Sequence, residues 1–121
     1  MIKTIPIKKN KDFVKLYKRG KFYVGRLIVL YVFLNNLNVN RIGITVSKKV
    51  GNSVKRNRIR RLIRENYRLN EGFVKTGYDF VFTARSFVVM PSFYDIKKEM
   101  KFLLKKLNVF DREQLDCQKD C

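Results

Sequence analysis

Residues 41–65 read RIGITVSKKVGNSVKRNRIRRLIRE and predict a strand, a basic loop and a helix in succession. In residues 41–47, polar and apolar side chains alternate, which is typical of a half-buried strand. Residues 48–53, KKVGNS, replace that alternation with two lysines and a glycine, so they predict a loop. Ser53 is placed to cap a helix that runs from about Val54 to Leu69.

Polar and apolar side chains separate onto opposite sides of this predicted helix. At ~100° per residue, one side carries Ile59, Leu62, Ile63 and Tyr67, and the other carries Asn57, Arg60, Arg61, Arg64 and Arg68. Arginines that recur every four residues form a row roughly 12 Å long, and arginine binds phosphate through paired N–H donors. A merely solvated face would normally carry glutamate between the arginines, but only Glu65 is present. The arginine side of the helix therefore predicts contact with a nucleic-acid backbone.

The segments before this stretch predict a basic arm, a helix and two strands. Residues 1–9 form the arm, in which Pro6 is expected to interrupt any regular element. A short helix follows over about residues 10–19, with Asn10 as its predicted cap. Residues 22–34, FYVGRLIVLYVFL, are rich in branched and aromatic side chains, which favours two strands bent at the glycine between them.

The segments after the central helix predict one more strand and one more helix. Residues 78–84, YDFVFTA, alternate as a strand does, and Pro91-Ser92 open the last helix. That helix has an apolar stripe expected to join the core: Phe93, Ile96, Met100, Leu103, Leu104 and Leu107. The order is helix, strands, helix, strand, helix. It predicts an α/β (α+β) two-layer sandwich, in which an about four-stranded mixed sheet packs with three helices.

The charge of the chain is strongly positive and unevenly distributed. Its 121 residues include 28 Lys and Arg against 10 Asp and Glu, a net charge of +18. Between Asp12 and Glu65 there are fourteen basic residues and no acid, whereas residues 109–121 carry four acids against two bases. We therefore expect a single α/β domain over residues 10–108 and an acidic, flexible tail after it. A polyanionic partner would offset the self-repulsion, and nucleic acid is favoured over a membrane surface or an acidic protein.

Several classes of function are excluded by the residues that are missing. No apolar run approaches the ~20 residues that span a bilayer, and no apolar segment follows Met1-Ile2-Lys3 as in a signal peptide. Cys117 and Cys121 are expected to be ordinary thiols in a reducing cytosol. The chain has no histidine, and the six acids of residues 1–108 are scattered. Neither a general base nor a metal-binding cluster is therefore expected, nor is catalysis by this chain alone.

Three aromatic residues are candidates for stacking on unpaired bases. Phe13 and Tyr17 are one helical turn apart, and Tyr31 lies on a predicted strand. Aromatic rings on RNA-binding surfaces stack on unpaired bases. The alternative is that the pair on the helix belongs to the core, and the spacing alone leaves both interpretations open.

The stretch quoted first resembles the signature of the bacterial ribonuclease P protein family. The resemblance centres on residues 55–64, KRNRIRRLIR, and includes NKDFVKLYKRG at residues 10–20. It extends from about Asn10 to Asn108 and so covers most of the chain. The motif is long and unusual, which makes the resemblance specific.

The resemblance implies an α/β sandwich with four strands and a left-handed crossover, made by the KKVGNS loop and the helix after it. It also implies that a separate large RNA carries the active site and holds the magnesium ions, with no organic cofactor. A member of this family would bind that catalytic RNA and the single-stranded 5′ leader of precursor tRNA. It would thereby assist the endonucleolytic removal of the leader.

The resemblance also assigns residues to these two ligands. Phe13, Tyr17 and Tyr31 match the aromatic residues of a leader-binding cleft between the sheet and the first helix. The residues that match the RNA-binding loop and helix are Lys48, Lys49, Lys55, Arg56, Asn57, Arg58, Arg60, Arg61 and Arg64, and Arg68 completes the arginine row. No catalytic or metal-binding residue is expected on this chain.

The alternative function is that of a ribosomal or other structural RNA-binding protein. It explains the composition equally well, but it does not explain an arginine-rich helix directly after VSKKVGN. A basic membrane-surface protein would need a helix whose apolar face is free of the core. The expected partners are therefore the catalytic RNA and precursor tRNA, with no membrane and no protein partner, in the cytoplasm.

Overall fold

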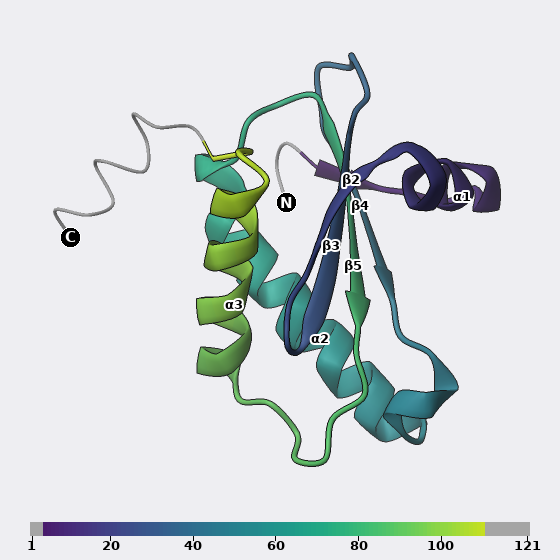
Figure 1. Cartoon of the computed structure of the whole chain (residues 1–121), viewed down its shortest axis with the longest axis vertical. Coiled ribbons are helices and arrows are strands. Elements are labelled where there is room, and N and C mark those ends of the chain that lie inside the picture. Colours follow the sequence, from purple (N-terminus) through teal and green to yellow (C-terminus); the bar gives the residue numbers. More distant parts are fainter. Residues whose placement is uncertain (1–3, 111–121) are drawn as a thin grey trace, which may run out of the picture.

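The computed structural model describes residues 4–110, which form a five-stranded sheet with helices on both of its faces (Figure 1). Residues 1–3 of the predicted arm and residues 111–121 of the predicted tail, with Cys117 and Cys121, lie outside the described residues. In chain order the elements are β1 (Thr4–Pro6), α1 (Asn10–Arg19), β2 (Lys21–Val24), β3 (Ile28–Leu34), β4 (Asn40–Thr45), the 3-10 turn η1 (Lys48–Val50), α2 (Ser53–Asn70), the 3-10 turn η2 (Glu71–Phe73), β5 (Tyr78–Ala84) and α3 (Phe93–Lys106). All three predicted helices and all four predicted strands are present.

The sheet is mixed, and its strand order is β1-β4-β5-β3-β2. β4 runs parallel to both of its neighbours, β1 and β5, whereas β3 runs antiparallel to β5 and to β2. The connection from β4 to β5 passes through η1 and α2, at the place where the resemblance implies a left-handed crossover. The mixed α+β class predicted from the sequence is confirmed.

The prediction of about four strands missed β1, and the expectation that Pro6 interrupts any regular element is wrong. β1 lies at the edge of the sheet beside β4, with Pro6 paired to Ile42. An edge strand tolerates proline where the backbone nitrogen points away from the sheet, because no hydrogen bond between strands is lost when the N–H is missing. Ile7 instead donates its N–H to the Ile42 carbonyl oxygen at 2.8 Å, so the pairing continues past the proline.

The main core lies between one face of the sheet and the helices α2 and α3, which lie together on one side of it in Figure 1. Ile63 of α2, Phe80 and Phe82 of β5 and Met100 of α3 are all fully buried there. The predicted apolar stripe of α3 is confirmed from Ile96 to Leu104, while Phe93 at its start remains exposed. The two-layer sandwich is therefore built by the sheet with α2 and α3, and α1 adds a partial layer on the opposite face.

Two of the predicted helix caps are displaced by one residue. Asn52, not Ser53, caps α2, and its side-chain oxygen accepts the N–H of Lys55 at 3.0 Å. Asn10 is already the first helical residue of α1 and makes no capping hydrogen bond. The Ser92 cap of α3 is confirmed, since its hydroxyl accepts the Asp95 N–H and the Asp95 carboxylate accepts the Ser92 N–H.

Candidate nucleic-acid interfaces

The helix α2 presents arginines to solvent because apolar side chains hold its opposite side against the sheet. Ile59, Ile63 and Tyr67 are buried, and burial raises the pKa of Tyr67 to about 12. The predicted RNA-binding residues of α2 that are exposed are Lys55, Asn57, Arg58, Arg61, Arg64 and Arg68. Arg56 and Arg60 are half-buried, so they lie at the border of the exposed face rather than in its middle.

The positive charge of this exposed face is almost unneutralised. Within residues 4–110, α2 takes part in one ion pair, between Arg68 and Glu65 at 3.1 Å. Both side chains of that pair are about half exposed, so the pair adds little stability. A shallow hollow of about 570 Å³ along the first half of the helix is lined by Val54, Asn57, Arg58, Arg61 and Leu62. A polyanion can therefore approach the basic face of α2 from Lys55 to Arg64 without displacing a carboxylate.

The loop before α2 continues this basic surface. Lys48 and Lys49 are exposed, and between them and the helix Val50 is buried and anchors the turn. Gly51 has φ +153°, and a Cβ there would lie 2.8 Å from the Lys55 side chain. Glycine therefore allows the two lysines to lie directly before the basic face of α2. We call Lys48, Lys49 and the exposed residues of α2 the basic surface.

The helix α1 packs on the opposite face of the sheet, which we call the α1 face. Leu16 is buried there with Ile7 and Val81. The ring of Phe13 lies directly over Gly43 of β4, because a Cβ at that position would be 2.4 Å from the Phe13 Cε1 atom. Phe13 is half-buried and so fills space between helix and sheet, as the core alternative expected, while part of its ring still reaches solvent.

Tyr17 and Tyr31 lie together on the α1 face beside this packed region. Their ring centroids are 4.9 Å apart with the planes at 79°, an edge-to-face contact. The Tyr17 hydroxyl is 3.2 Å from the Thr45 hydroxyl, which in turn is 2.8 Å from the hydroxyl of Thr83. Tyr17 is still 40 % exposed. The structure therefore brings the three predicted aromatic residues to one face and leaves ring surface open for a stacked base.

Arg41 holds α1 in place over the sheet, a role that sequence reasoning missed. Its guanidinium donates to both carboxylate oxygens of the buried Asp79, at 2.8 and 2.6 Å, and to Asp12 of α1 at 3.3 Å. Asn35 also donates to Asp79, at 2.8 Å. The hydrogen bond to Asp79 is the main reason that the pKa of Arg41 lies above its usual value. Arg41 is thus engaged within the protein by two carboxylates.

Phe22 is a second residue that sequence reasoning missed. It lies opposite Tyr31 in the β2–β3 pair, with ring centroids 5.6 Å apart, and it is 56 % exposed. The turn is centred on Arg26 and Leu27, since the Gly25 N–H donates to the Ile28 carbonyl oxygen, and counting outward from these two residues places Phe22 opposite Tyr31. Paired residues in a hairpin share a face.

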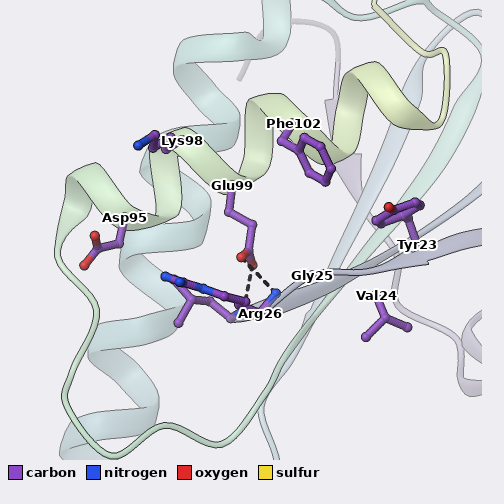
Figure 2. A pocket seen from close by; sticks show the side chains of 9 residues that line it. Tyr23, Val24, Gly25, Arg26, Asp95, Lys98, Glu99 and Phe102 are labelled. Atoms are coloured by element: carbon purple, nitrogen blue, oxygen red, sulfur yellow. Dashed lines mark hydrogen bonds between the residues drawn. The ribbon is translucent and has the colours of Figure 1, made fainter.

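A separate hollow of about 580 Å³ lies between the β2–β3 connection and α3 (Figure 2). Its Glu99 carboxylate accepts the N–H groups of Arg26, Leu27 and Ile28 at 2.7–3.0 Å. Glu99 therefore fixes the strand connection to α3. The remaining charged groups of this hollow are Arg26, Lys98 and Asp95, so its charge is nearly balanced and it attracts a polyanion less than the basic surface does.

Four of the six carboxylates of the described residues serve the fold, which does not suit them to a magnesium site. Asp12 and Asp79 bind Arg41, Asp95 caps α3, and Glu99 binds backbone N–H groups. Across residues 4–110, no three His, Cys, Asp or Glu side chains are grouped as metal ligands. None of the helices in that range is long and apolar enough to cross a membrane.

Comparison with known proteins identifies the family. Residues 1–108 match the model of the family described as Ribonuclease P. The ribonuclease P protein component of Clostridium kluyveri is 51 % identical over 106 residues, covering 86 % of this chain and 95 % of the relative. That of Clostridium botulinum (strain Loch Maree) is 49 % identical over 111 residues, covering 91 % of this chain and all of the relative.

Solved structures agree with these relatives. The RNase P protein of Staphylococcus aureus superposes with a TM-score of 0.79 at 36 % identity, covering 88 % of this chain and 97 % of that one. The RNase P protein from Thermotoga maritima gives 0.76 at 28 % identity, covering 84 % and 96 %. The family model, the relatives and the solved structures agree with the arginine-rich helix, so the chain belongs to the bacterial ribonuclease P protein family.

Proposed function

We propose that this chain works in the ribonuclease P holoenzyme through two separate surfaces. The basic surface binds the catalytic RNA, and the exposed part of the α1 face binds the single-stranded 5′ leader of precursor tRNA. The observation that carries this division is the placement of the two surfaces on opposite sides of one sheet. One protein can then contact both RNAs without competition between them.

The chemistry of each surface matches its proposed ligand. The basic surface is exposed and arginine-rich, which suits the phosphates of a large folded RNA. The α1 face offers tyrosine rings beside threonine hydroxyl groups, and only unpaired bases can stack on such rings. A duplex has its bases already stacked and paired, so the α1 face should prefer the leader.

The protein contributes binding and positioning, and we propose that the RNA holds the magnesium ions and performs the chemistry. Four described carboxylates, those of Asp12, Asp79, Asp95 and Glu99, are engaged in the fold, which supports this division of labour. A net charge of +18 would offset repulsion between the two RNAs, a task otherwise left to magnesium. We place this assembly in the cytoplasm, with no membrane and no further protein partner.

Cleavage of precursor tRNA by the catalytic RNA at low magnesium concentration tests this proposal. Adding the protein should restore accurate removal of the leader, while the protein alone should cleave nothing. A ribosomal protein of similar size and charge is the control for nonspecific neutralisation. Equal rescue by that control would favour a general RNA-binding protein, and turnover by RNA-free protein would contradict the assignment of chemistry to the RNA.

A further inference from the structure

A row of paired residues crosses the α1 face from β4 to the edge strand β2. Gly43 pairs with Val81, Val81 pairs with Tyr31, and Tyr31 pairs with Phe22. Residues paired directly across strands point to the same face of a sheet. Phe13 and Leu16 cover the first half of this row, which lies beneath α1. In the second half, Tyr31 is half-buried against Tyr17 of the helix, and Phe22 extends beyond the residues that pack under α1.

The ring of Phe22 continues the aromatic surface begun by Tyr17 and Tyr31. Its plane is tilted by 32° from that of Tyr31, and the two ring centroids are 5.6 Å apart. Tyr17 also contacts Tyr31, at a centroid distance of 4.9 Å. A phenylalanine that is 56 % exposed adds little to the core, so packing does not account for its presence there. The three rings together make a surface longer than the one predicted from the sequence.

The charges around Phe22 favour an anionic ligand. Lys18 and Arg19 are exposed in the last turn of α1, four and three residues before Phe22. No ion pair engages either of them among residues 4–110. A ligand that is both aromatic and negatively charged fits this combination, and a nucleotide is such a ligand. A second copy of the chain fits poorly, because two chains of charge +18 repel each other.

We propose, resting on the function proposed above, that Phe22 extends the leader-binding surface by one nucleotide past Tyr31. A base of the leader stacks on the exposed ring at the β2 edge, and its phosphate lies near Lys18 and Arg19 in the last turn of α1. β4 leads directly into η1 and the basic surface, whereas β2 is the far edge of the sheet. The base on Phe22 is therefore farther from the catalytic RNA, and from the cleavage site, than the base at Tyr17.

The experiment measures the affinity of the holoenzyme for precursor tRNAs whose leaders grow one nucleotide at a time. The variants are Phe22→Ala, Phe22→Trp and Tyr17→Ala. Tyr23→Ala is the matched control, because Tyr23 is the next residue of the same strand and is 39 % exposed. Its ring points to the opposite face and meets Phe102 edge-to-face at 5.6 Å (Figure 2).

Phe22→Ala should weaken binding about tenfold, the scale of one stacked base, but only for leaders above a threshold length. That threshold should exceed the one for Tyr17→Ala. Phe22→Trp should retain affinity, Tyr23→Ala should match the parent at every length, and all variants should melt at nearly the parent temperature.

Three outcomes would overturn the role proposed for Phe22 and leave the rest of the leader surface intact. They are no loss of affinity in Phe22→Ala at any leader length, an equal loss for leaderless substrate, or a threshold leader length no longer than that of Tyr17→Ala. A change in self-association in place of leader affinity would also overturn it and indicate a second copy as the ligand. If Tyr17→Ala itself is insensitive to leader length, the proposed leader surface fails, and the function proposed for the α1 face fails with it.

Discussion

The basic surface and the α1 face differ in how much of the chain each one needs. The basic surface comes from residues 48–70, one continuous stretch made of a turn and a helix. The α1 face is assembled from α1 and four strands, β2 to β5, which are spread over residues 21–84, and Arg41 holds it together between Asp12 and Asp79. A charged surface of the first kind depends on local structure, whereas an aromatic surface of the second kind depends on tertiary packing.

This difference predicts which function fails first when the protein is damaged. Loosening the packing of α1 should disturb Phe13 and Tyr17 while the helix α2 keeps its arginines exposed. Leader binding should therefore be more sensitive to destabilising substitutions than binding of the catalytic RNA. The substitutions below are ordered from the largest expected effect to the smallest.

Arg41→Ala should lower the free energy of unfolding by about 3–5 kcal/mol, because it leaves the buried Asp79 carboxylate without its ion pair. Denaturant unfolding followed by circular dichroism measures the loss. Adding Asp79→Asn to this variant should recover part of it by removing the unpaired charge. A loss below about 1 kcal/mol would mean that Asn35 and solvent satisfy Asp79 without Arg41.

Arg61→Ala combined with Arg64→Ala should weaken binding of the catalytic RNA by roughly 3 kcal/mol, from two charge-assisted contacts. The slope of log K against log salt should become less steep by about 2. The loss should be the same for every leader length. Arg26→Ala with Lys98→Ala removes the same charge near α3 and serves as control; an equal loss there would make the effect a matter of net charge alone.

Gly43→Ala should destabilise the protein by about 2 kcal/mol, because the added methyl group meets the Phe13 ring at 2.4 Å. The helix α1 must then shift, and leader affinity should fall while affinity for the catalytic RNA stays unchanged. Filter binding with each RNA separately measures both. A parallel loss for the two RNAs would show that the α1 face and the basic surface are coupled through the sheet.

Tyr17→Phe should change leader affinity by no more than about 0.5 kcal/mol, since the ring that stacks is retained. It removes only the contact of 3.2 Å between the Tyr17 and Thr45 hydroxyl groups. Equilibrium binding of a long-leader substrate checks this small effect. A loss as large as that of Tyr17→Ala would instead indicate that the hydroxyl group binds the leader directly.

Local patterns in the sequence predicted the helices well, because helix periodicity depends on near neighbours. The stripe from Ile96 to Leu104 and the buried side of α2 follow directly from spacing. The basic surface could be predicted for the same reason. Arg60 is an exception: it was placed on the outward side but is half-buried, and its guanidinium donates to the Asn57 side chain of the same helix at 3.3 Å.

Features that depend on pairing across the sheet could not be read in the same way. β1 was missed because proline argues against a strand unless its position at the edge is known. Arg41 was counted within the acid-free segment between Asp12 and Glu65, although it pairs with Asp12 at the start of that segment and with Asp79, well beyond its end. Phe22 became a candidate only once the β2–β3 register placed it opposite Tyr31.

The central position of β5 has a consequence for how the protein is made. β3 and β4 both pair with β5 and not with each other, so no sheet can close until residues 78–84 have left the ribosome. The cationic helix α2 is synthesised before β5, the strand that completes the core on which it packs. Until β5 emerges, α2 remains exposed next to ribosomal RNA. Long-range pairing of this kind slows folding. A chain ended before Tyr78 should show no cooperative unfolding transition by calorimetry, and nascent chains should become resistant to protease only after β5 emerges.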